Sequence, residues 1–135
     1  MNAEQTMAAI DDLVSHVWMV RAFLKHSDEA AEDDELASVH RDLYDFMLAL
    51  GPSLDAGDAD EYLKMAKKKL TKLKQAVELF LEIQPEISTH TNFKMAARSL
   101  KLATADIVGL VNGYRRATNS DHRVKPDDAP SPAKD

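Results

Sequence analysis

Residues 63–80 read LKMAKKKLTKLKQAVELF, and their apolar side chains recur at alternating steps of three and four. The stripe consists of Leu63, Ala66, Leu70, Leu73, Val77 and Phe80. An α-helix turns once in about 3.6 residues, so this spacing places the whole stripe on one side of a helix. The segment therefore predicts an amphipathic helix that buries one face and leaves its lysines in water.

Three further segments carry the same rhythm. The first comprises Ile10, Leu13, Val17, Val20 and Leu24. The second comprises Leu36, Val39, Leu43, Phe46 and Leu50. The last comprises Phe93, Ala96, Leu100, Ala103, Ile107, Leu110 and Tyr114. Four helices with one apolar face each can close on a common core, so we expect an all-α fold.

Capping and breaking residues set the expected ends of these helices. Gly51-Pro52 predicts the end of the second helix, and Pro85 predicts the end of the third, because the residue before a proline is pushed out of the α region. Asp58, with Glu61 three residues later, is typical of a helix start. The expected helices span about residues 5–26, 33–50, 59–84 and 91–117.

Short connections between long helices favour antiparallel neighbours. The sequence therefore predicts an antiparallel up-down-up-down four-helix bundle over residues 1–118. The alternative is a pair of helical hairpins that completes its core only in a dimer. Residues 119–135 contain three prolines and a single valine, so we expect a disordered C-terminal tail without an apolar face.

Length and composition narrow the class of protein. A chain of 135 residues is about one domain long, and the absence of cysteine excludes disulfides, thiolate zinc sites and a cysteine nucleophile. The first residues lack basic side chains, and Asp11 and Asp12 interrupt the first apolar run, unlike a secretory signal. No window approaches the roughly 18 uncharged apolar residues of a membrane span. We expect a cytoplasmic protein with no membrane partner.

The net charge of −6 conceals an asymmetry between the two halves of the chain. Residues 1–61 hold 15 acidic and 3 basic side chains, a balance of −12, whereas residues 62–135 hold 14 basic and 8 acidic, a balance of +6. A difference in charge of this size between the two halves influences the choice of partner and self-association more than it influences the fold.

The sequence offers little for metal or cofactor chemistry. Metal sites in helical bundles use inward carboxylates and Glu-x-x-His pairs, but no stripe position is acidic and no Glu-x-x-His occurs. His16 and His40 flank their stripes, and Asp12 lies one turn before His16, which is more typical of residues at the edge of a core than of metal ligands. We predict no metal, no cofactor and no catalytic residue.

Arg21 and His26 stand with four residues between them. This spacing resembles the Arg-x4–6-His motif of the helical HEPN ribonucleases, and the resemblance implies a nuclease-type bundle whose pair meets its twin across a dimer. In that family the pair lies near the start of a late helix, whereas here it ends the first expected helix and nothing else matches. Arg21 with Lys25 also fits a basic i,i+4 pair at a helix C-terminus.

Lysines dominate one segment of the third expected helix. Six lysines fall within residues 64–74 with no acidic residue among them. Within this segment, Lys64, Lys68 and Lys72 form a basic row on one side of the third helix. A second basic row on the fourth helix consists of Lys94, Arg98 and Lys101. The two rows suggest an alternative function in nucleic-acid or polyanion binding. The negative total charge, the lack of arginine in the lysine segment and the scarcity of aromatics disfavour nucleic acid, and a solvated lysine face is the simplest interpretation.

Several apolar or small residues lie away from the main stripes. Val14 and Trp18 are one turn apart on a second line of the first helix, while Ala105, Gly109 and Gly113 form a small-x-x-x-small row on the fourth. Glycine costs about 1 kcal/mol relative to alanine inside a helix, so this row suggests that another backbone comes close. We therefore expect a non-enzymatic bundle that acts by protein–protein interaction, as a homodimer or by binding a partner helix.

Overall fold

The computed structural model describes the backbone of residues 1–124 and the side chains of residues 1–114. Across residues 1–124 the chain forms five helices and no strand, so the predicted all-α class is confirmed. The helices are α1 (Ala3–Lys25), α2 (Asp28–Glu32), α3 (Asp34–Ala56), α4 (Ala59–Ile87) and α5 (Thr91–Val124).

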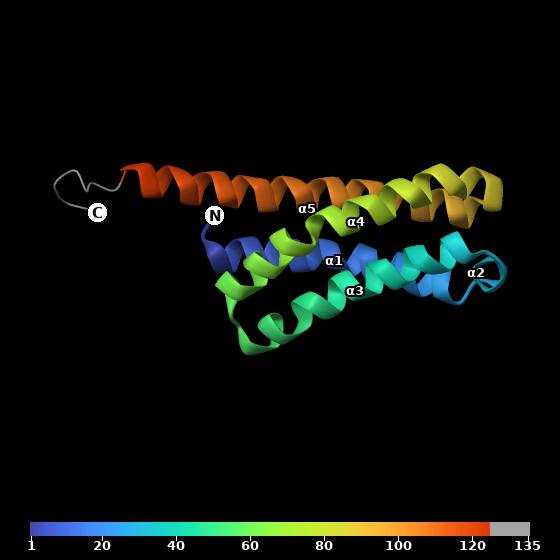
Figure 1. Ribbon diagram of the computed structural model, residues 1–135, viewed down its shortest axis with the longest axis horizontal. Coiled ribbons are helices and arrows are strands. Elements are labelled where there is room, and N and C mark those ends of the chain that lie inside the picture. Colours follow the sequence, from blue (N-terminus) through green and yellow to red (C-terminus); the bar gives the residue numbers. More distant parts are fainter. Residues whose placement is uncertain (125–135) are drawn as a thin grey trace.

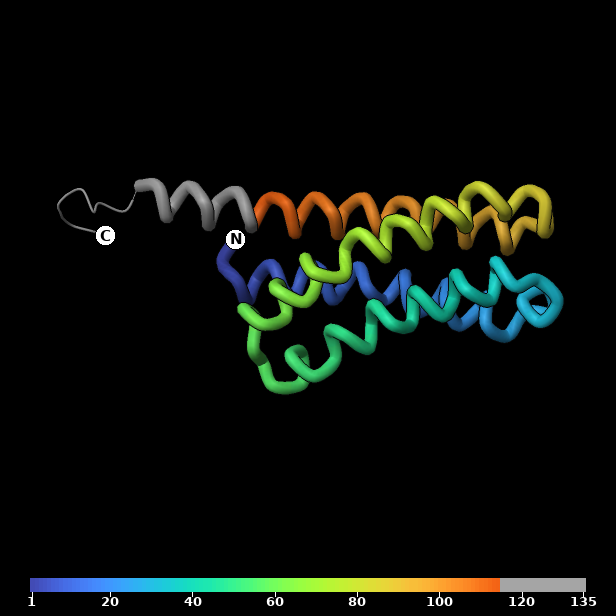
Figure 2. The backbone as a smooth tube through the Cα atoms, in the orientation of Figure 1, coloured from blue at the N-terminus to red at the C-terminus, as the bar shows by residue number. Residues whose placement is uncertain are grey.

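The four long helices lie alongside one another, and the chain reverses direction at each connection between them (Figure 1). Figure 2 shows the same path as a tube, with the connection through α2 at one end of the molecule and the α3–α4 connection at the other. The most extensive contacts join α3 to α4 and α1 to α5, while α1 also packs on α3, and α4 on α5.

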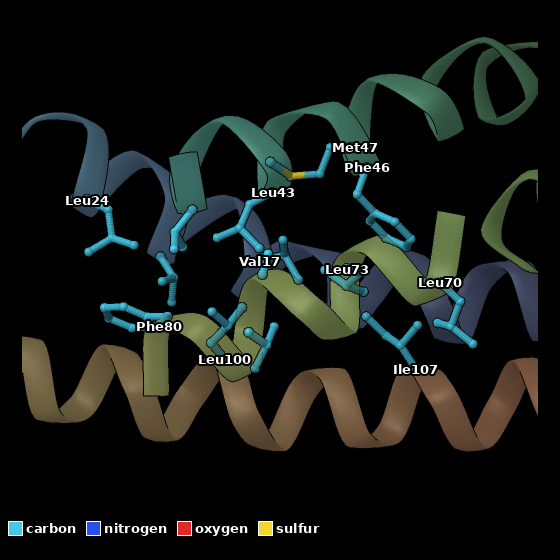
Figure 3. Packing of buried hydrophobic residues seen from close by; sticks show 14 of the residues in the cluster. Val17, Leu24, Leu43, Phe46, Met47, Leu70, Leu73, Phe80, Leu100 and Ile107 are labelled. Atoms are coloured by element: carbon cyan, nitrogen blue, oxygen red, sulfur yellow. The ribbon is translucent and has the colours of Figure 1, made fainter. Parts of the chain in front are cut away.

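A single apolar core fills the space between these helices (Figure 3). Each long helix contributes side chains with no exposed surface, among them Val17, Leu43, Leu73 and Leu100. All the predicted stripe positions are buried except Leu13, Leu110 and Tyr114, which are partly buried and pack against the core. The predicted stripes therefore mark the buried face of each long helix.

The acidic segment between α1 and α3 forms a separate short helix. Ser27 caps α2 by accepting a hydrogen bond from the Ala30 N–H (3.2 Å), and Asp33 caps α3 by accepting one from the Leu36 N–H (2.9 Å). Asp33 has extended backbone (φ −131°), which separates the two helices. Its neighbouring carboxylates stand at the positive ends of both helix dipoles.

The predicted ends of the second and third helices are wrong, because α3 continues through Pro52 to Ala56 and α4 continues through Pro85 to Ile87. A proline removes only its own N–H, and the bond that is lost is the one to the carbonyl four residues earlier. Both prolines lie on the exposed side of their helices, where water can solvate the freed carbonyl.

The stop of α3 is Gly57 rather than Gly51. Gly57 adopts the left-handed conformation (φ 66°), which glycine enters without steric cost. Its N–H donates to the Leu54 carbonyl (3.0 Å), and the Asp58 N–H donates to the Ser53 carbonyl (2.9 Å). This pair of bonds is a Schellman motif. Asp58 then caps α4 as predicted, by accepting a hydrogen bond from the Glu61 N–H (3.1 Å).

The last helix also differs from its predicted bounds. The helix begins at Thr91, and His90 caps it because the His90 Nδ1 accepts a hydrogen bond from the Asn92 N–H (3.0 Å). The helix ends at Val124 rather than near residue 117, since no proline interrupts the sequence before Pro126. Residues 119–124 of the predicted disordered tail therefore belong to α5, and residues 125–135 lie outside the described part of the chain.

A matched pair of leucines on α3 tests the packing. Leu43 is fully buried, whereas Leu48 is 54% exposed. We expect Leu43→Ala to lower the free energy of unfolding by about 2–5 kcal/mol, because it leaves a cavity between helices. Leu48→Ala should change it by less than about 0.5 kcal/mol. Urea denaturation followed by circular dichroism measures both, and equal losses would contradict this packing.

Candidate functional site

A cationic and aromatic cluster lies in the seam between α1 and α3. The Arg21 guanidinium carbon is 4.1 Å from the centroid of the Tyr44 ring on α3 and 5.8 Å from that of the Trp18 ring on its own helix. A guanidinium within about 6 Å of an aromatic face is attracted by the π electrons. Trp18 is nevertheless 49% exposed, so the cluster orders this indole without covering it.

Two apolar residues lie one helical turn from members of the cluster. Val14 lies one turn before Trp18 and is partly buried against the core, and Leu48 lies one turn after Tyr44 on the same face of α3. Together Val14, Trp18, Arg21, Tyr44 and Leu48 are called the α1–α3 surface below. The sequence singled out Val14 and Trp18 only, because the pairing of Arg21 with Tyr44 depends on how the two helices align.

Arg21 has an unused hydrogen-bond donor. Its Nε atom is buried and has no acceptor within the described part of the chain. Burial lowers the pKa of His40, and the nearby positive charges of Arg21, Arg41 and Lys25 lower it further, so three cations lie close to this histidine. An incoming carboxylate would meet a favourable potential from these positive charges.

The residues predicted to form a partner face do not form one face. Val14 and Trp18 lie on the side of α1 that packs on α3, whereas Ala105 and Gly109 are exposed on α5 and Gly113 is half-buried there. A Cβ added at Gly109 or Gly113 would meet nothing within 4 Å. The close approach that these glycines suggested is therefore not made within the described chain.

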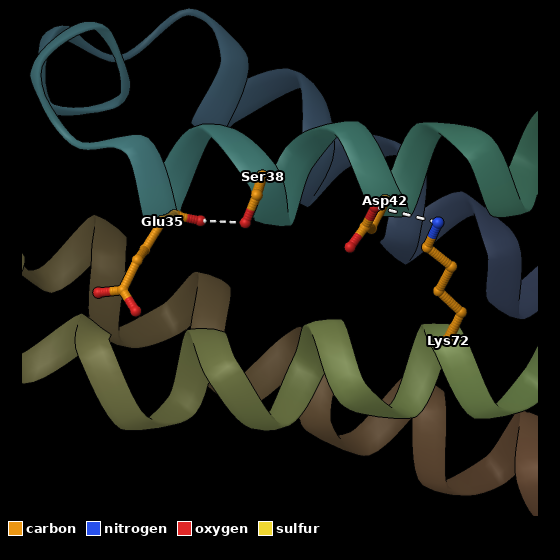
Figure 4. Close-up of polar contacts among 4 residues, drawn as sticks. All are labelled: Glu35, Ser38, Asp42 and Lys72. Atoms are coloured by element: carbon orange, nitrogen blue, oxygen red, sulfur yellow. Dashed lines mark hydrogen bonds and ion pairs between the residues drawn. The ribbon is translucent and has the colours of Figure 1, made fainter.

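The predicted basic rows are exposed on α4 and α5 but not joined into one. All six residues, Lys64, Lys68, Lys72, Lys94, Arg98 and Lys101, are exposed. The Lys72 Nζ lies 3.8 Å from the Asp42 Oδ1 on α3 (Figure 4), so this lysine turns toward α3 rather than toward α5. The other five have no carboxylate within 4.0 Å among the side chains of residues 1–114.

Arg21 and His26 do not converge on a common site. Five residues along a helix correspond to about 140° around its axis, and Arg21 is directed toward α3. The His26 Nδ1 lies 2.9 Å from the Ala22 carbonyl oxygen at the end of α1. The geometry gives no support within one chain to the pair that the HEPN resemblance implied.

The other histidines that flank the core are also apart. The His16 Nδ1 lies 3.2 Å from the Ser99 Oγ on α5, while His40 faces the positive charges near Arg21. Among the described side chains, no group of three or more histidine, aspartate or glutamate residues could hold a metal ion.

Tyr62 and Asp11 form a polar contact that sequence reasoning missed. Tyr62 is fully buried on α4, and its hydroxyl has no hydrogen bond of good geometry within residues 1–114. Burial, and after it the negative charge of Asp11, raises the pKa of Tyr62 far above its ordinary value. Burial, together with the charge of Asp12, also raises the pKa of Asp11. Tyr62 stands four residues before Ala66 and so fits the spacing of the buried stripe, but its contact with Asp11 depends on the packing of α1 on α4.

Comparison of the chain with protein-family models, curated proteins and solved structures gave no match. The described helices include none that is both long enough and apolar enough to cross a bilayer.

The electrostatics of the seam can be tested on His40. Arg21→Gln should raise the pKa of His40 toward its ordinary value, because one of the positive charges that oppose its protonation is removed. Arg98→Gln, a matched change on α5, should leave the pKa unchanged. The imidazole proton shifts in a two-dimensional NMR titration report the pKa. An identical midpoint in Arg21→Gln and the unmodified protein would exclude the proposed coupling.

Proposed function

We propose that the four long helices form an antiparallel up-down-up-down bundle that acts without catalysis, by protein–protein contact through the α1–α3 surface. The observation that carries this proposal is the exposure of Trp18 beside the stacked Arg21, together with the exposure of Leu48 one turn along α3 from Tyr44. Large apolar side chains beside an ordered arginine are typical of interfaces, whose energetic hot spots are enriched in Trp, Tyr and Arg.

The stacking also reduces the cost of binding. Immobilising a side chain on association costs about 0.5–1.5 kcal/mol, and the Tyr44 ring already restrains the Arg21 guanidinium. Binding would therefore immobilise fewer freely moving side chains on this surface than on a helix face whose side chains are unrestrained.

The same surface indicates the chemistry of the partner. The positive charges of Arg21, Arg41 and Lys25 favour a carboxylate, whereas the exposed Trp18 and Leu48 favour an apolar side chain. An amphipathic helix with an acidic residue one turn from a large apolar residue meets both requirements.

Polyanion binding through α4 and α5 is the alternative function. Five exposed cations without an ion pair in the described part of the chain favour it. The engagement of Lys72 with Asp42 and the burial of Tyr62, Phe80 and Phe93 weigh against nucleic acid, because these three rings are not available to stack on a base.

Site-specific photocrosslinking tests the proposal. With p-benzoylphenylalanine at position 48 of the full chain in host cells, we expect a protein adduct, whether with a different protein or a second copy. The same probe at position 19, where Met19 is also exposed (66%), should give little adduct. Trp18→Ala should reduce the yield at position 48 at least about fivefold, because truncating a hot-spot tryptophan costs more than about 1 kcal/mol. Met19→Ala should not reduce it.

Two results would overturn the proposal. Equal labelling from positions 19 and 48 would show that partners do not contact the α1–α3 surface in preference to the rest of the protein. An adduct that nuclease digestion removes, and that Lys64→Glu with Lys68→Glu abolishes, would instead establish polyanion binding.

A further inference from the structure

The outward face of α5 carries an exposed stripe of mixed chemistry. Met95, Arg98, Leu102, Asp106 and Gly109 succeed one another at steps of three or four, so they lie on one side of the helix. All five are exposed, with Met95 at 48% and Leu102 at 66%. These residues are called the α5 stripe. None of them belongs to the α1–α3 surface.

The α5 stripe is symmetric in position about Leu102 and complementary in chemistry. Arg98 and Asp106 each lie four residues from Leu102, on opposite sides of it, and Met95 and Gly109 each lie seven residues away. A two-fold axis through Leu102 would place an antiparallel second copy so that each arginine meets an aspartate. The same operation would place each methionine opposite a glycine.

The charged pair is free to be made between copies. Neither Arg98 nor Asp106 has an ion-pair partner within 4.0 Å among the described side chains. A two-fold arrangement would form the Arg98–Asp106 pair twice, whereas a parallel arrangement in register would place Arg98 against Arg98 and Asp106 against Asp106. Like charges placed opposite one another are costly at an interface. Charge therefore selects the antiparallel orientation.

The sizes of the facing residues also match. Gly109 borders a surface hollow of about 200 Å³ between the start of α1 and α5, lined by Met1, Thr6, Gly109, Leu110, Gly113 and Tyr114. Nothing in the described part of the chain requires glycine at position 109, since an added Cβ would meet no neighbouring atom within 4 Å. If a second copy inserts its Met95 into this hollow, the absence of a side chain at Gly109 leaves the space that Met95 needs.

We propose that the α5 stripe is a self-association surface, on which a second copy of this chain packs antiparallel across Leu102. The interface would place Arg98 against Asp106, and Met95 into the hollow at Gly109. This inference goes beyond the proposed function because it assigns a different face and a defined occupant.

Charge exchange on the full chain is the test, with sedimentation equilibrium over a concentration series as the readout. We expect Arg98→Asp alone and Asp106→Arg alone each to weaken dimerisation about tenfold or more, because each places like charges together. The double variant should restore the dimer to within about threefold of the unmodified protein. Lys64→Asp, a matched reversal on α4, should have no such effect.

A second pair of variants tests the hollow. Gly109→Met should fill it and weaken the dimer about tenfold or more, while helical circular dichroism stays unchanged because the position is exposed. Gly109→Ala should raise the melting temperature of the monomer at low concentration, since alanine favours a helix over glycine.

Three outcomes would overturn the inference. The chain could sediment as a monomer up to millimolar concentration, or the double charge variant could fail to recover the dimer lost in the single variants. Trp18→Ala could also abolish a dimer that Arg98→Asp leaves intact. That last result would move self-association to the α1–α3 surface and would support the proposed function. Absence of crosslinking at position 48, by contrast, would leave the α5 dimer unaffected.

Discussion

Each long helix has a single apolar face, and all four faces must close on the same core for any of them to leave water. Removing apolar surface from water is the main favourable term in folding, at roughly 25 cal/mol per Å². Val17, Leu43, Leu73 and Leu100, one from each long helix, are all fully buried in the single core. Because these faces are committed to the core, residues elsewhere on the helices are left for other roles. Trp18 and Leu102 are residues of this kind.

The three-four spacing determined which face of each helix is buried, because burial follows the period of the helix. The ends were less predictable. Pro52 and Pro85 lie inside helices at exposed positions, and local rules for proline do not include that exposure. His90 caps α5 through a ring nitrogen, a role usually taken by Ser, Thr, Asp or Asn.

The candidate site was predictable only in part, for a related reason. Trp18 stands out in the sequence as a large residue off the stripe, but its relation to Arg21 and Tyr44 depends on the alignment of α1 with α3. Likewise, Lys72 reads as one member of a basic row until Asp42 on α3 is seen beside it. Local periodicity specifies a face of a helix, whereas contacts between helices depend on their relative register and rotation.

The two proposed surfaces are compatible with each other. The α1–α3 surface uses the seam that α1 shares with α3, and the α5 stripe faces outward from α5. An antiparallel dimer across Leu102 would therefore leave Trp18 and Leu48 free in both copies. Two such surfaces in one particle would give avidity for a partner that presents two matching helices.

Both proposals require that all four long helices belong to one cooperative unit. Native-state hydrogen exchange measures this requirement most directly. The amides of Val17, Leu43, Leu73 and Leu100 should exchange with one common free energy, equal to that of global unfolding. A free energy lower by about 2 kcal/mol or more in any one long helix would contradict a single shared core.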